Sequence, residues 1–220
     1  MAEQVKTQSP GNVWKVLVKP GDRVITNPPV YPPFDMCIVE AGGVVDRVPL
    51  IDNGTGWELD LAGIEASFAA GARSILLCNP HNPTGTVHSR ESLAALAEIA
   101  ERFGATVVSD EIHSPSTQPG VTFTPFISAS DAAARVGYVI TSASKAFNLA
   151  GLKCALIITA SDGPTQIVAD LPPEVEWRTG LFGALAAVAA FAPESDEWLD
   201  SLLAALDERR RVDPGDIAAE

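Results

Sequence analysis

Three short, mostly apolar runs that stop abruptly at polar residues constrain the fold of this chain more than any other feature. The runs cover residues 74–78, 106–109 and 136–141, and each passes directly into a polar segment. Apolar runs of this length, separated by amphipathic helical stretches, are typical of strands in a parallel sheet covered on both faces. The pattern predicts an α/β fold, with a mostly parallel sheet and helices on both faces in an α/β/α sandwich.

Residues that can carry chemistry follow each of the three runs. Asn82 follows the first run, Asp110 the second and Lys145 the third. In sheets of this kind, ligands bind beyond the carboxyl ends of the strands. We therefore expect these three side chains to converge on one site, although they lie far apart in the sequence.

The neighbours of Lys145 are small hydroxyl residues, Ser142 and Ser144, rather than acids. The segment offers the lysine no obvious salt-bridge role, and serines are small enough to let a phosphate group approach the backbone of a turn. We interpret Lys145 as a lysine that forms a Schiff base. The alternative is a surface lysine whose stem lies on the edge of the sheet.

Periodicity and turn residues predict the remaining elements. Expected strands cover residues 23–26, 44–50 and 154–159, and expected helices cover 34–41, 60–70, 180–191 and 194–211, with a further helix that Ser89 caps and that runs to Phe103. The alternation of strands and helices up to Asp110 predicts right-handed crossovers. The segment 180–191 is small and apolar almost all round, which predicts a helix packed on several sides.

The chain of 220 residues is long enough to bury a sizeable core. Residues 1–12 are polar and without period, so we expect an irregular lead-in. Residues 13–170 are expected to form the large domain. We expect residues 171–220 to be a helical segment that leads to a largely missing small domain.

Composition argues against several classes of protein. The net charge of −13 argues against a nucleic-acid partner. No apolar run approaches the roughly 20 residues that a membrane span needs, and no signal-peptide pattern is evident, so we expect a cytoplasmic protein without a membrane partner. Cys37, Cys78 and Cys154 are interpreted as buried thiols, and the spacing of the histidines predicts no zinc site.

Four motifs together carry a resemblance to a known family. They are PVYPPF at 29–34, NPHNPTG at 79–85, SDEIH at 109–113 and SASK at 142–145. In this order and approximate spacing they resemble the fold-type I pyridoxal-phosphate enzymes, the class I and II aminotransferases. The subgroup that they resemble most is that of the MalY/PatB-like cystathionine beta-lyases, and the resemblance covers roughly residues 13 to 211.

The resemblance implies roles for the two central residues. Lys145 would bind the cofactor, pyridoxal 5'-phosphate, covalently and then act as the base that moves the α proton of the substrate. Asp110 would pair with the pyridine nitrogen and hold it protonated. Without the resemblance, Asp110 could equally cap a turn that follows its strand.

The same resemblance implies roles for five further residues. Asn82 and His113 would reach the phenolic oxygen of the cofactor, and Tyr31 would stack on its ring. Ser142 and Ser144 would hold the phosphate. For Tyr31 and His113 the alternatives are an ordinary packed aromatic ring and a surface imidazole.

Two departures from the family pattern stand out. Most class I aminotransferases carry an arginine as a phosphate contact eight residues after the lysine, and this chain has Lys153 there, which supplies charge without a bidentate fork. Family members are also about twice as long, and no arginine here can be assigned to the substrate carboxylate. We expect exposed apolar surface where a small domain would pack, and a homodimer, because family sites lie at subunit boundaries.

The resemblance favours a carbon–sulfur beta-lyase that acts on sulfur amino acids and releases a thiol, pyruvate and ammonia. This preference rests on Ile112, His113 and the segment FNLAG at 147–151, and so on resemblance to a subgroup. The first alternative is an aminotransferase that uses the same residues. The second is a truncated, catalytically silent protein that binds the cofactor or a partner.

Overall fold

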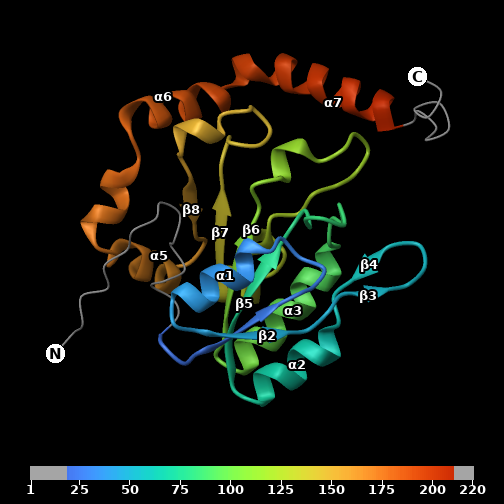
Figure 1. The fold of residues 1–220 in the computed structure, drawn as a ribbon, viewed down its shortest axis with the longest axis vertical. Coiled ribbons are helices and arrows are strands. Elements are labelled where there is room, and N and C mark those ends of the chain that lie inside the picture. Colours follow the sequence, from blue (N-terminus) through green and yellow to red (C-terminus); the bar gives the residue numbers. More distant parts are fainter. Residues whose placement is uncertain (1–18, 211–220) are drawn as a thin grey trace.

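The computed structural model describes residues 19–210, in which six strands form one sheet in the order β2-β1-β5-β6-β7-β8 (Figure 1). The strands are β1 (Arg23–Thr26), β2 (Val44–Arg47), β5 (Ala72–Cys78), β6 (Thr106–Asp110), β7 (Gly137–Thr141) and β8 (Leu156–Ile158). All neighbours pair in parallel except β7 and β8, which are antiparallel. The short strands β3 (Ile51–Asp52) and β4 (Trp57–Glu58) form a separate hairpin at one side.

Seven α-helices accompany the sheet in the described residues. They are α1 (Pro33–Glu40), α2 (Leu61–Ala69), α3 (Arg90–Arg102), α4 (Asp131–Val136), α5 (Asp162–Ala169), α6 (Leu181–Ala190) and α7 (Asp196–Arg210). Short 3-10 turns join them, among them η3 (Phe126–Ser128), η4 (Ala150–Leu152) and η5 (Pro173–Arg178). No helix within residues 19–210 is long and apolar enough to cross a membrane.

Helices cover both faces of the sheet, which confirms the predicted α/β/α arrangement. The larger core contains Ile64 of α2, Leu96 of α3 and Ala133 of α4, packed against residues of the strands. On the other face, Phe34 and Ile38 of α1 pack against a smaller cluster from β1, β5 and β6. Burial of these apolar side chains is the main source of stability for such a layered fold.

The ends of the central strands lie at one level because of their register. Cys78 pairs with Asp110, and Asp110 in turn pairs with Ile140. The segments that follow β5, β6 and β7 therefore leave the sheet at the same edge. This arrangement is the one that the predicted convergence of Asn82, Asp110 and Lys145 needs.

The predicted helix cap at Ser89 is confirmed, and Asp60, predicted as the first residue of a helix, is the cap of α2. The Ser89 side chain accepts a hydrogen bond from the backbone N–H of Ser92 at 3.1 Å, and Asp60 caps α2 by accepting from Gly63 N at 2.9 Å. Each cap satisfies an N–H that has no partner within the helix, which is worth about 1 kcal/mol.

The structure corrects two details of the sequence reading. In the residues described, α6 is covered on one side only and leaves Leu181, Phe182, Leu185 and Val188 exposed, although packing on several sides was predicted. Cys78 is buried as predicted, but Cys37 and Cys154 are partly exposed. The predicted lead-in 1–12 and the end of the predicted helical segment, residues 211–220, lie outside the described part of the chain.

Candidate functional site

The segment that carries Lys145 is a compact turn beyond the carboxyl end of β7. Backbone hydrogen bonds hold it, from Asn148 N to Lys145 O at 3.2 Å and from Phe147 N to Ala143 O at 3.1 Å. The Phe147 ring stacks on Trp198 at 5.6 Å, next to the junction of α6 and α7, which lie across this end of the molecule (Figure 1). The turn is thus anchored on an aromatic support, while the Lys145 side chain is exposed.

Asp110 ends the neighbouring strand and interacts electrostatically with Lys145. Burial raises the pKa of the Asp110 carboxyl, and the hydrogen bond from Ile112 N to its Oδ1, at 3.1 Å, and the charge of Lys145 oppose that shift. Burial lowers the pKa of His113, and the charge of Lys145 lowers it further. The structure therefore brings Lys145, Asp110 and His113 into one region from two adjacent strands.

Asn82 is held beside this region by Cys78. The Cys78 thiol donates to Pro80 O at 3.4 Å, and its sulfur accepts from Asn82 N at 3.3 Å. Burial raises the pKa of Cys78 to about 12, so the side chain is a thiol and can donate. Because Cys78 pairs with Asp110 in the sheet, these bonds keep the backbone of Asn82 next to the end of β6.

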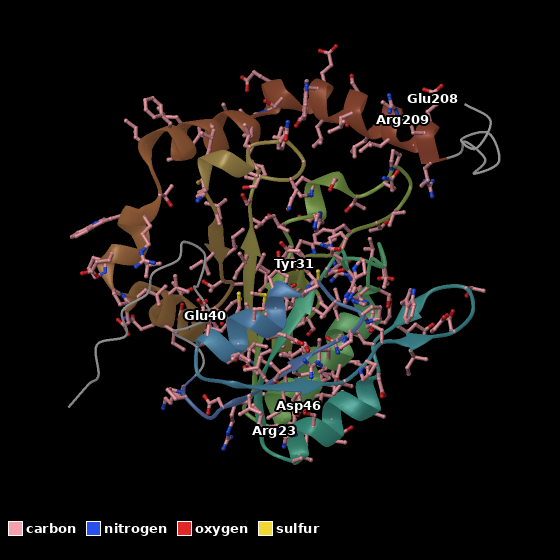
Figure 2. All side chains as sticks on the ribbon, viewed as in Figure 1. Arg23, Tyr31, Glu40, Asp46, Glu208 and Arg209 are labelled. Atoms are coloured by element: carbon pink, nitrogen blue, oxygen red, sulfur yellow. The ribbon has the colours of Figure 1, made fainter. Side chains whose placement is uncertain are left out.

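His81 connects the Asn82 segment to the loop that carries Tyr31. His81 Nε2 lies 2.9 Å from Pro29 O, and a carbonyl only accepts, so Nε2 carries the hydrogen. Tyr31 is 44% exposed and meets Phe34 edge to face, with ring centroids 6.3 Å apart. Figure 2 shows Tyr31 well separated from Arg23, which lies at the opposite end of β1.

The predicted phosphate contacts lie in the connection from β7 to β8. Ser142 Oγ donates to Cys154 O at 2.5 Å and lies 2.6 Å from Ser144 Oγ, which must therefore be the donor of that second bond. Lys153 is exposed and has a left-handed backbone, with φ of 51°. Both serine hydroxyls thus have partners within the protein, and Lys153 adjoins the residue that holds Ser142.

Glu111 was not singled out in the sequence, although it lies inside the SDEIH motif. Its side chain is buried, and its carboxylate accepts from Ser109 Oγ and from Phe126 N. Burial raises its pKa to about 7. The sequence feature that could have identified Glu111 is its position as a second acid directly after Asp110, at the end of a mostly apolar strand.

Comparison with known proteins agrees with this geometry. The family described as "Aminotransferase class I and II" matches residues 11–212, and the chain belongs to this family. Cystathionine beta-lyase PatB of Bacillus subtilis is 35% identical over 194 residues, a match that covers 86% of this chain and 49% of PatB. The chain thus spans about half the length of this relative.

Solved structures give the same result. Cystalysin from Treponema denticola, whose crystal structure contains pyridoxal 5'-phosphate, has a TM-score of 0.81 and 27% identity, covering 91% of this chain and 52% of cystalysin. N-succinyldiaminopimelate aminotransferase from Mycobacterium tuberculosis has a TM-score of 0.78 and 30% identity, covering 90% of this chain and 51% of that protein. The predicted family and fold are confirmed.

Proposed function

We propose that this chain is the large-domain part of a pyridoxal-phosphate-dependent carbon–sulfur beta-lyase that acts on sulfur amino acids. The observation that carries the proposal is the meeting of Lys145, Asp110 and His113 beyond the ends of β6 and β7. The name of PatB as a cystathionine beta-lyase and the cofactor of cystalysin support the choice of reaction and cofactor.

The donor set at this edge fits the cofactor. Its aldehyde needs a primary amine, which Lys145 supplies, and its pyridine nitrogen needs an acid, which Asp110 supplies. Burial raises the pKa of Asp110 and so favours its neutral form, whereas a protonated ring nitrogen beside it would lower that pKa and favour the ionised carboxylate. Asn82 and His113 would bind the phenolic oxygen, and Tyr31 would stack on the ring.

The proposed phosphate contacts are Ser142, Ser144 and Lys153. Lys153 supplies a charge near the turn, and the two hydroxyls would exchange their present internal partners for phosphate oxygens. The residues just before Lys145, from Ser142 to Ser144, have small side chains, which would let a phosphate group approach the backbone of this segment.

When bound, pyridoxal phosphate supplies an electron sink for the charge left at the substrate Cα. Lys145 Nζ would take the Cα proton, and the Asp110 carboxylate would hold the ring nitrogen in its protonated form. The sulfur leaves with the electron pair of the Cβ–S bond and takes up a proton as the thiol. One water completes the conversion of the remaining fragment to pyruvate and ammonia.

An aminotransferase reaction is the second candidate, because it uses the same proton transfer at Lys145. The similarity to N-succinyldiaminopimelate aminotransferase supports it. The third candidate, a catalytically silent module, is favoured by the exposed apolar side chains of α6, such as Phe182 and Val188. Release of pyruvate from cystathionine would support the beta-lyase, whereas exchange of the amino group with a keto acid would support the aminotransferase.

We also propose how the chain is organised and where it acts. Of the described residues, 19–170 would belong to the large domain, and 171–210 would lead toward a small domain. The exposed apolar face of α6 favours a homodimer, since such a face is unfavourable in water. We propose that the protein acts in the cytoplasm, in keeping with a composition typical of globular proteins.

The test is the visible absorbance of the purified chain with pyridoxal phosphate, before and after borohydride reduction, in wild type and Lys145→Ala. A band that reduction fixes covalently at Lys145, and that the variant lacks, supports the cofactor site. Pyruvate release from cystathionine that Lys145→Ala abolishes then supports the lyase. A wild-type chain without the band favours the silent module.

A further inference from the structure

We propose that Glu111 is a positioning residue that fixes the placement of Asp110 relative to the Lys145 turn. The inference rests on the proposed function, because these are the two groups that would hold the cofactor nitrogen and its reactive carbon. The buried carboxyl group of Glu111 has no part in the roles proposed for Asp110 and Lys145, and the inference gives it one.

The backbone of Glu111 ties the end of β6 to the end of β7. Glu111 N donates to Ile140 O at 2.8 Å, and Thr141 Oγ1 donates to Glu111 O at 3.4 Å. Thr141 is the last residue of β7, and the turn with Lys145 begins immediately after it. The residue next to Asp110 is thus bonded to the two residues from which the Lys145 turn starts.

The side chain of Glu111 also stabilises the end of β6, through two further hydrogen bonds. A single oxygen, Oε1, accepts from Ser109 Oγ at 2.9 Å and from Phe126 N at 2.8 Å. Phe126 is fully buried in the larger core and opens η3, whereas Ser109 directly precedes Asp110. Ser109 and Glu111, the residues on either side of Asp110, are therefore hydrogen-bonded to each other through Glu111 Oε1. The same oxygen also bonds to Phe126 in the core.

These bonds add to the restraints that Asp110 has of its own. Its backbone carbonyl accepts a hydrogen bond from Asn79 N at 2.9 Å, just after β5. The bond that Asp110 Oδ1 accepts, from Ile112 N, is local to its own turn. The bonds of Glu111 reach β7 and η3, 15 to 30 residues away. Loss of the Glu111 side chain would leave the Phe126 N–H buried without its acceptor, so the loop would shift to recover a partner.

Glutamine provides a matched variant for the test. In Glu111→Gln the amide oxygen can accept both bonds, whereas Glu111→Ala removes both. Ser109→Ala removes one of the two bonds and leaves the carboxyl in place, which covers the case that Glu111→Ala fails to fold. Leu96→Ala, at a fully buried position of α3, is the control for destabilisation elsewhere in the core.

Two readouts are measured under conditions in which each variant is folded. The first needs no cofactor: the hydrogen exchange of the Ile112 and Phe126 amides. The second is the affinity for pyridoxal phosphate, together with the fraction that borohydride fixes at Lys145. We expect Glu111→Ala to speed exchange at both amides and to weaken cofactor affinity about tenfold or more, Ser109→Ala to give a smaller change, and Glu111→Gln to stay near wild type.

The outcomes separate positioning from general stability. If Glu111→Ala leaves both amides and the affinity unchanged, or if Leu96→Ala weakens the affinity as much, the proposal is wrong. Failure of Glu111→Gln to restore wild-type behaviour would also contradict it. If the wild type binds no cofactor, the proposed function fails, and amide exchange still decides whether Glu111 holds the ends of β6 and β7 together.

Discussion

Cys78 and Asp110 lie directly opposite each other in the register of β5 and β6, and the Cys78 sulfur also bonds the backbone that leads to Asn82. Cys78 therefore links two of the residues that would hold the cofactor, Asp110 through the backbone pairing of the strands and Asn82 through its sulfur. A further bond, to Pro80 O, depends on the thiol remaining protonated, because the thiol hydrogen is donated to that carbonyl.

The first prediction concerns the reactivity of this thiol. Burial raises the pKa of Cys78 to about 12, so at pH 8 it is protonated and inaccessible, whereas Cys154 is partly exposed. We expect iodoacetamide to modify Cys154 in the folded chain and Cys78 only after unfolding. Mass spectrometry of peptides from folded and urea-treated protein measures this. Rapid labelling of Cys78 in the folded chain would show that the thiol is not held as described.

The second prediction concerns stability in acid. Burial lowers the pKa of His88 from 6.5 to about 4, so above pH 6.5 the imidazole is neutral in both the folded and the unfolded chain. Between pH 6.5 and about 4 only the unfolded chain gains the proton, and folding loses up to about 3 kcal/mol. The unfolding free energy of the wild type relative to that of His88→Phe is therefore expected to fall by about this amount between pH 6.5 and 4, because the comparison cancels the groups that both chains share. Urea unfolding of both chains at several pH values measures it, and a constant difference between them would contradict the assignment.

The third prediction has the opposite sign, because Glu111 is a buried acid. Its pKa is raised from 4.5 to about 7, so its contribution to stability is complete below pH 4.5 and is lost as the pH rises toward 7. The loss amounts to about 3 kcal/mol. Glu111→Gln does not titrate, so its stability relative to wild type should increase between pH 4.5 and 7. Equal stability changes at pH 4.5 and pH 8 would show that Glu111 ionises normally.

The central strands and their end residues could be predicted from the sequence because the signals are local. A buried parallel strand needs a continuous apolar run, and Asp110 and Lys145 come at or soon after the ends of such runs. Since parallel strands share one carboxyl edge, the convergence of these two residues followed from the strand positions alone.

The supporting contacts could not be predicted in the same way. The bond from His81 to Pro29 joins residues 52 positions apart, and the bonds of Glu111 depend on where Phe126 packs. The exposed face of α6 was missed for a related reason. Apolar residues on several sides of α6 indicate that these sides pack against apolar partners. The sequence does not indicate whether those partners belong to the described part of the chain.

The fourth prediction addresses this face. Leu185 is 57% exposed and Val188 is 73% exposed, so replacing them should cost the isolated fold little. The double variant Leu185→Glu, Val188→Glu is expected to shift a self-associating chain toward the monomer with the melting temperature of the monomer preserved. Light scattering over a concentration series measures this, and Ile51→Glu, on the separate β3–β4 hairpin, is the matched control. Equal dissociation of the control would show that added charge, rather than this face, is responsible.

The last prediction concerns Lys153, where the family commonly carries arginine. A guanidinium group binds a phosphate through two parallel N–H donors, whereas an ammonium group acts as a point charge. Lys153→Arg keeps the charge, and the variant side chain starts from the same left-handed backbone position as the lysine. The change therefore tests only the shape of the hydrogen-bond donor. We expect pyridoxal phosphate to bind about fivefold more tightly, corresponding to about 1 kcal/mol. Titration followed by absorbance measures the affinity, with Lys19→Arg as the control beyond the amino end of β1. If Lys153→Arg and Lys153→Ala both bind as wild type, Lys153 does not contact the phosphate, and the serine hydroxyls and the backbone of the turn must hold it alone.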